Sequence, residues 1–83
     1  MTIKELYDFV NKMQKEELFS KVNIDVLGGL ALISAIVEDF SFDNLMCFLK
    51  ENSKIVQTFK SLALRNVEGN NYINVEVWLE DER

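Results

Sequence analysis

The sequence of 83 residues contains no proline, no histidine and a single cysteine, and these shortages exclude several classes of protein. Without histidine, the chain lacks the most common ligand of transition metals and the usual acid–base group of enzymes. The lone Cys47 cannot form an internal disulfide, and it is typical of a reducing, intracellular compartment. We therefore expect no metal site, no cofactor and no catalytic residues, and we do not expect an enzyme.

The small size of the chain limits the stability that it can reach alone. Eighty-three residues predict a single domain over residues 1–83, and such a chain buries only about 60% of its unfolded surface. Because disulfides and metals are not expected, a partner chain is the remaining stabiliser, and we expect a homodimer. No apolar stretch reaches the roughly 20 residues of a membrane span, and no signal sequence is recognisable. The expected location is therefore the cytoplasm.

The net charge of −5 disfavours nucleic acid as a partner, since an acidic protein repels the phosphate backbone. The charge is uneven along the chain. Residues 44–65 have a net charge of +3, because they carry Lys50, Lys54, Lys60 and Arg65 against Glu51. This segment is the one place where binding to nucleic acid is conceivable.

Residues 24–37 form the most apolar stretch of the chain. From Val26 to Val37, only Ser34 is neither apolar nor glycine. A helix that is apolar on all sides is buried on all sides, so we predict a central helix over residues 24–37. Two explanations of Gly28–Gly29 stay open: another helix approaches closely there, or the helix begins at Gly29 after an extended segment.

Shorter amphipathic helices are expected around this central helix. Thr2 and Glu5 have the spacing of a capping box, which predicts a helix from about Thr2 to Phe19. Phe9 lies outside its buried stripe, so we expect it to be either partly exposed or covered by a neighbouring element. That stripe is expected to consist of Ile3, Leu6, Tyr7, Val10 and Met13. A third helix is expected to end near Lys50. A fourth begins at Ser53, and its buried face is expected to consist of Ile55, Val56, Phe59 and Leu62.

Alternation of apolar and polar residues over 62–67 and 72–79, around a turn within residues 68–71, predicts a C-terminal β-hairpin. The alternation places Leu62 and Leu64 on one face of the hairpin and Trp78 on the other, for a loop at 69–70 or at 70–71, although the exact register does not follow. The expected fold class is thus α+β and mainly helical: about four helices around the helix at 24–37, followed by an antiparallel hairpin.

The order of elements in residues 41–79 (helix, turn, helix, hairpin) resembles that of winged-helix domains. In that family, the second helix of the pair enters the major groove of DNA. The resemblance implies DNA contacts by the following residues: Lys54, Gln57, Thr58 and Ser61. The hairpin departs from the family, because it carries Glu68, Glu76 and Glu80 where the wing usually contacts phosphate. A winged-helix-like, DNA-binding transcriptional regulator is the alternative function.

The function that we expect first is protein binding, by a small acidic adaptor, regulator or inhibitor. The composition also suits an inhibitor encoded by a phage or a mobile element. An exposed tryptophan on a sheet is a typical binding anchor, so Trp78 is the first candidate, with Tyr72 and Glu76 from the same strand. Phe40 and Phe42, just beyond the predicted central helix, are expected to join a dimer contact. The identity of a protein partner does not follow from the sequence.

Overall fold

The computed structural model describes residues 1–38 and 42–80 of the chain. The first half contains helix α1 (Ile3–Lys15) and strands β1 (Phe19–Leu27) and β2 (Leu30–Val37). The second half contains helices α2 (Phe42–Glu51) and α3 (Ser53–Val56) and strands β3 (Phe59–Val67) and β4 (Asn70–Trp78). The strands form one sheet in the order β1-β2-β4-β3, and every neighbouring pair is antiparallel.

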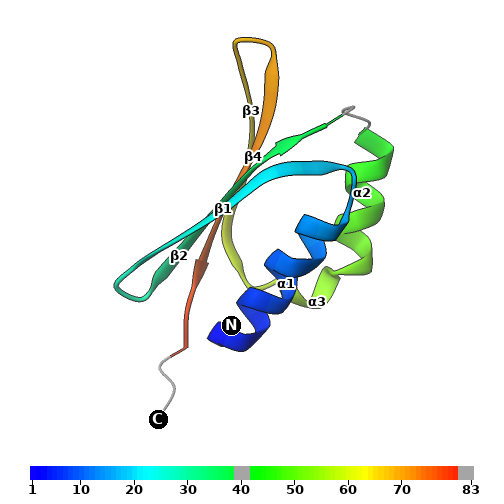
Figure 1. Ribbon diagram of the computed structural model, residues 1–83. Helices are drawn as coiled ribbons and strands as arrows, with labels where there is room; N and C mark the ends of the chain where they lie inside the picture. Colours follow the sequence, from blue (N-terminus) through cyan, green and yellow to red (C-terminus); the bar gives the residue numbers. More distant parts are fainter. Residues whose placement is uncertain (39–41, 81–83) are drawn as a thin grey trace.

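Helices α1, α2 and α3 lie on one face of this sheet, which we call the inner face, and the two hairpins extend in opposite directions (Figure 1). The central strands bury alternate residues against the helices: Ala31, Ile33, Ala35, Ile73, Val75 and Val77. The helices contribute these buried side chains: Leu6, Phe9, Val10, Met13, Leu45 and Phe48. The core therefore lies between the helices and the inner face.

The predicted central helix at residues 24–37 is wrong, and so is the mainly helical fold class. This stretch is the second half of β1, a turn at Gly28–Gly29 and all of β2. Strand β2 lies between β1 and β4, and it carries apolar side chains on both of its faces. A central strand of this kind loses the alternation that identifies a half-exposed strand, so its sequence looks like that of a buried helix.

The two hairpin turns differ in backbone conformation. Gly28 has a φ of +62°, whereas the φ of Gly29 lies outside the left-handed region, as in a type II′ turn. Glu68 and Gly69 both have positive φ, at +51° and +86°, as in a type I′ turn. The predicted C-terminal hairpin and its faces are confirmed, since Leu62 pairs with Val75, but the turn falls at Glu68–Gly69, earlier than either position expected.

The first helix begins as predicted but ends earlier. The backbone N–H of Glu5 donates to Thr2 Oγ1, and that of Thr2 donates to Glu5 Oε1, both at 3.1 Å, which confirms the capping box. The hydrogen bonds from Thr2 hold the pKa of the Glu5 carboxyl below its usual value. The helix ends at Lys15, and Phe19 already belongs to β1.

The buried stripe of α1 differs from the predicted one. Phe9 is only 1% exposed, because its ring packs against the rings of Phe48 and Phe59, with centroids 5.8 and 5.6 Å away. Tyr7, which was predicted to be buried, is 51% exposed. The helix is therefore rotated on the sheet relative to the orientation that we expected.

The predicted fourth helix begins at Ser53 as expected but is much shorter, so the winged-helix resemblance fails even though two helices and a hairpin follow one another here. Helix α3 contains only four residues, Ser53–Val56, while Phe59 and Leu62 belong to β3. The C-terminal hairpin is not a separate wing, since β4 pairs with β2 in the common sheet. Helix α3 ends in a turn in which the Thr58 backbone N–H and hydroxyl both donate to the Ile55 carbonyl, at 2.9 and 2.6 Å.

The two halves of the sheet match in register. Strand β1 spans residues 19–27 and strand β3 spans residues 59–67, so β3 begins and ends forty residues after β1. Phe19 pairs with Val37, and Phe59 pairs in the same way with Val77. Each hairpin also has one irregularity near the start of its first strand. Between the halves, Ser34 pairs with Asn74.

Candidate protein-binding surface

The sheet has a second face, the outer face, over which none of α1, α2 and α3 lies (Figure 1). Because side chains alternate along a strand, the residues between the buried positions of β2 and β4 point to this face. The cross-strand pairs on the central strands are Leu30–Trp78, Leu32–Glu76, Ser34–Asn74 and Ile36–Tyr72. The outer face is therefore apolar at both ends and polar in the middle.

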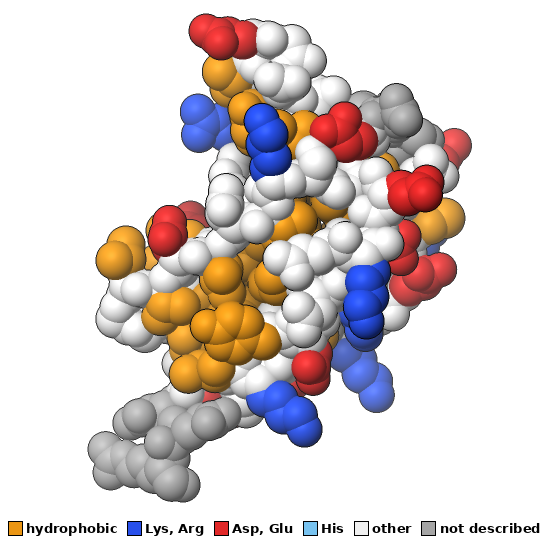
Figure 2. Space-filling view, viewed as in Figure 1, with side chains coloured by type: hydrophobic (Ala, Val, Ile, Leu, Met, Phe, Trp, Pro, Cys, Tyr) orange, Lys and Arg blue, Asp and Glu red, His pale blue; other side chains and the backbone are white. Residues whose placement is uncertain are grey.

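Apolar side chains gather at the end of the outer face that carries the β1–β2 turn. Leu27 is 67% exposed, and it pairs with Leu30, which in turn pairs with Trp78. Leu32 is the next residue after Leu30 on this face of β2, so it adjoins these side chains. Figure 2 shows hydrophobic side chains gathered over the end of the β1–β2 hairpin. We call these four residues the outer apolar cluster: Leu27, Leu30, Leu32 and Trp78.

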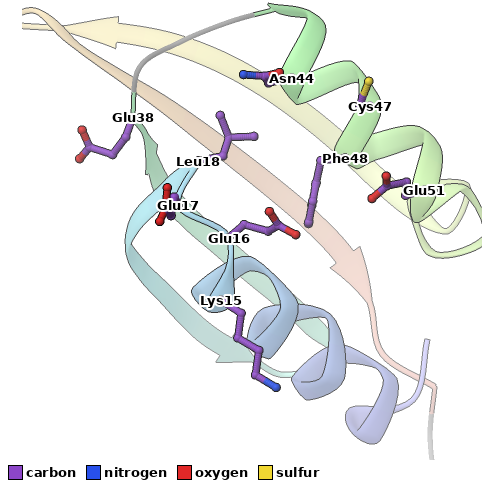
Figure 3. Close-up of a pocket in the computed structure, with 9 residues that line it drawn as sticks. All are labelled: Lys15, Glu16, Glu17, Leu18, Glu38, Asn44, Cys47, Phe48 and Glu51. Carbon is purple, nitrogen blue, oxygen red and sulfur yellow. The ribbon is translucent and has the colours of Figure 1, made fainter.

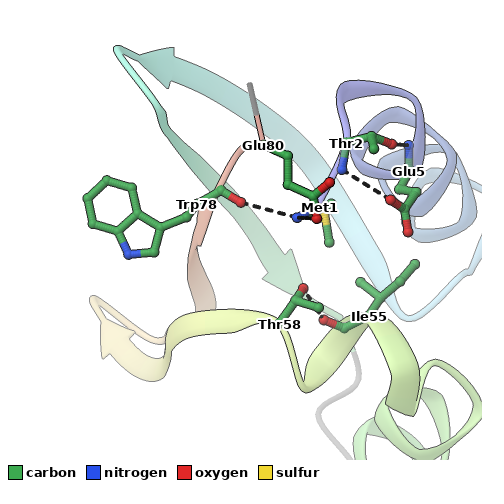
Figure 4. Close-up of polar contacts among 7 residues, drawn as sticks. All are labelled: Met1, Thr2, Glu5, Ile55, Thr58, Trp78 and Glu80. Atoms are coloured by element: carbon green, nitrogen blue, oxygen red, sulfur yellow. Dashed lines mark hydrogen bonds and ion pairs between the residues drawn. The ribbon is translucent and has the colours of Figure 1, made fainter. Parts of the chain in front are cut away.

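Trp78 is fixed through its backbone, and its ring is free to make contacts. Its carbonyl oxygen accepts a hydrogen bond from the Met1 nitrogen at 3.4 Å, and the next N–H, that of Leu79, donates to the Gly29 carbonyl at 2.7 Å. Figure 4 shows the indole pointing away from Met1 and helix α1. The side chain is 56% exposed, in agreement with the face predicted from alternation.

Charged groups beside Trp78 orient one another. Lys60 Nζ lies 5.5 Å from the centroid of the Trp78 ring, close enough for a cation–π contact. The same ammonium lies 3.5 Å from Glu76 Oε2, and the Ser61 hydroxyl donates to Glu76 Oε1 at 2.9 Å. A preformed arrangement of this kind loses less conformational entropy when a partner covers it.

The predicted partner-binding residues separate into two groups. Trp78, Tyr72 and Glu76 lie together on the outer face of β4. Phe42 is exposed at the start of α2, in the helical layer on the opposite side of the sheet, and Phe40 lies outside the described residues. The binding role of each residue stays a prediction.

Sequence reasoning missed the three leucines of the outer apolar cluster, because they fell within the predicted central helix. The signal that identifies them is the Gly28–Gly29 pair, since two glycines between two apolar runs are typical of a two-residue hairpin turn. When the turn is placed there, Leu27 and Leu30 become neighbours across the hairpin, as the structure shows.

The residues proposed for DNA contacts do not form a recognition helix. Lys54 belongs to the four-residue helix α3, Gln57 caps that helix, and Thr58 is hydrogen bonded to Ile55. Ser61 lies on β3, where it donates to Glu76. These side chains therefore share no helical face that could enter a groove.

A cleft of about 490 Å³ lies between the end of α1 and helix α2 (Figure 3). Its lining is rich in carboxylates, from Glu16, Glu17, Glu38 and Glu51. Cys47 also lines the cleft, and its side chain is exposed. Among the described residues, no three potential ligands lie close enough together to hold a metal ion.

Comparisons with known proteins give no family for this chain. No protein-family model matches the sequence, and no curated protein matches it. None of the helices in residues 1–38 and 42–80 has the length and apolar character needed to cross a bilayer.

Proposed function

We propose that this protein is a small acidic protein-binding module, which acts as an adaptor, regulator or inhibitor through the outer face of its sheet. The observation that carries the proposal is the outer apolar cluster, which surrounds a tryptophan with a fixed backbone and a more than half exposed ring. Tryptophan is among the residues that most often dominate binding energy at protein interfaces. The lone Cys47 supports action in the cytoplasm.

Charge supports a protein partner over nucleic acid. The net charge of −5 disfavours contact with phosphates. The basic residue beside the cluster, Lys60, already forms an ion pair with Glu76. The rim of mixed charge around an apolar centre resembles the general anatomy of protein interfaces.

Affinity capture with matched variants tests this proposal. The tagged wild type, Trp78→Ala and Leu64→Ala are incubated with lysate of the source cells, and the retained proteins are identified by mass spectrometry. Leu64 is the control, because it is also an exposed apolar residue but its partner Ile73 places it on the inner-face side. We expect a protein that is retained by the wild type and Leu64→Ala and lost with Trp78→Ala. Equal retention by all three would contradict the proposal.

A further inference from the structure

We propose that the outer face binds a second copy of this chain, so that two sheets pack face to face in a symmetric dimer. This inference rests on the proposed function, because it names the partner of the same surface. Three observations support it: the size of the face, its charge balance and the arrangement of its edges.

The outer face is large enough to supply most of one side of a stable dimer interface. Its strands contain eight or nine residues, which at about 3.3 Å per residue gives a length of about 30 Å. Four strands with a spacing of about 4.8 Å give a width of about 19 Å, hence about 570 Å² in projection. The relief of the side chains adds to this area, and a stable interface buries about 800 Å² on each partner. A second copy presents a surface of equal size, whereas a single peptide strand covers only part of the face.

The charges on the outer face remove an obstacle to self-association. Two chains of net charge −5 repel each other, so they approach most easily through surfaces that are not acidic. The regular outer positions of β1 and β4 carry Asp25 and Glu76, while β3 carries Arg65 on this face and Lys60 above the Trp78 ring. Two acidic and two basic groups balance, so the face is neutral within an acidic protein. Lys21, at the irregular part of β1, and Glu38, whose carboxylate accepts from the Ser20 hydroxyl, add one charge of each sign near the edge.

Near the outer apolar cluster, the two edges of the sheet complement each other across a two-fold axis. An axis that runs parallel to the strands, between β2 and β4, places β1 over β3 of the second copy and β2 over its β4. By register, Asp25 on one edge then comes opposite Ser61 on the other edge, next to Lys60, and Leu30 comes opposite Trp78. Sheets that pack face to face commonly keep their strands within about 30° of each other, which suits this axis.

Sedimentation equilibrium of the full chain, at concentrations from low to high micromolar, tests the dimer. We expect the apparent mass to rise from 9.7 kDa towards twice that value. Trp78 is the only tryptophan, so its emission should shift to shorter wavelength over the same concentration range as the ring becomes buried. Leu27→Lys should weaken the dimer by about tenfold or more, because the interface would bury an unpaired ammonium.

Leu64→Lys is the matched control, since Leu64 is 43% exposed but lies on the inner-face side of β3. Its dimer should have the same dissociation constant as the wild type within about twofold.

A wild type that keeps a mass of 9.7 kDa at high micromolar concentration would overturn the inference. A doubled mass without any change in Trp78 emission, or equal weakening by both lysine variants, would overturn it too. If the protein stays monomeric but captures another protein through Trp78, only the dimer is refuted. If it stays monomeric and captures nothing through Trp78, the proposed function fails as well.

Discussion

Gly28→Ala distinguishes the hairpin from the helix that the sequence suggests, because the two structures predict opposite signs for its effect on stability. In the interior of a helix, a glycine costs about 1 kcal/mol relative to alanine, so Gly28→Ala and Gly29→Ala would both stabilise the protein. In the hairpin, Gly28 has a φ of +62° at the first central position of a type II′ turn, a conformation that costs an L-residue about 1–3 kcal/mol.

The magnitude of the Gly28→Ala effect follows from two opposing contributions. A Cβ atom at Gly28 meets no atom within 4 Å, so the penalty comes from the backbone conformation alone. Alanine also restricts the unfolded chain, which offsets about 0.4–1 kcal/mol of that penalty. We expect the free energy of unfolding to fall by about 1–2 kcal/mol, and each kcal/mol lowers Tm by about 4–8 °C in a domain of this size.

Gly29→Ala is the control, because the φ of Gly29 is not in the left-handed region and its Cβ would also meet no atom within 4 Å. Only the effect on the unfolded chain remains, so this variant should be more stable by about 0.4–1 kcal/mol. Urea unfolding followed by circular dichroism measures both changes, provided that the slope with denaturant is unchanged. If Gly28→Ala were as stabilising as Gly29→Ala, the assignment of the turn would be refuted.

Two further variants test the core and the second turn. Phe9→Ala should lower the free energy of unfolding by about 3–5 kcal/mol, because Phe9 is buried between Phe48 and Phe59, whereas Tyr7→Ala should change it by about 0.5 kcal/mol or less. If urea unfolding gave similar losses of unfolding free energy for Phe9→Ala and Tyr7→Ala, the assignment of the buried stripe of α1 would be wrong. Glu68→Asn should raise the free energy of unfolding by about 0.5–1 kcal/mol, and Tm with it, since asparagine tolerates a φ of +51° better than glutamate. Glu68→Gln removes the same charge without this tolerance, so an equal gain in Glu68→Gln would refute the backbone explanation.

Local signals predicted the parts of the fold that depend on neighbouring residues. The capping box marked the start of α1, and regular alternation marked the C-terminal hairpin and the exposed face of Trp78. These features are determined within a few residues of the chain. The sequence therefore contained enough information to find them.

Features that depend on distant segments could not be predicted in the same way. The apolar character of β2 on both faces comes from its central place in the sheet and from the outer apolar cluster, and both follow from pairing with β4 more than thirty residues away. Phe9 is buried by rings from α2 and β3, which no periodicity within α1 reveals. Of the candidate surface, β4 was identified from the sequence and the leucines of the β1–β2 hairpin were not.

The matched register of the two hairpins gives the sheet an approximate two-fold symmetry within a single chain. The Ser34–Asn74 pair joins residues that are themselves forty positions apart, so the symmetry axis passes through this pair and exchanges β1 with β3 and β2 with β4. The helices are related in the same way, but their equivalent positions are thirty-nine residues apart in the sequence. Leu6 and Phe9 of α1 correspond to the buried Leu45 and Phe48 of α2. The molecule is thus built like a fused dimer of two αββ units.

The symmetry breaks where Asn52 occupies the position that corresponds to Met13 of α1. Met13 is an apolar core residue, whereas the buried Asn52 donates from Nδ2 to the Phe48 carbonyl at 2.9 Å and accepts from Lys12 at 3.3 Å. This one polar residue divides the second helical segment into α2 and α3. It also links the two units, because its amide joins the helix of one half to a lysine from the other. Two halves with the same topology therefore carry different helical surfaces, so a partner that binds the helical layer meets two distinct surfaces instead of a repeated one.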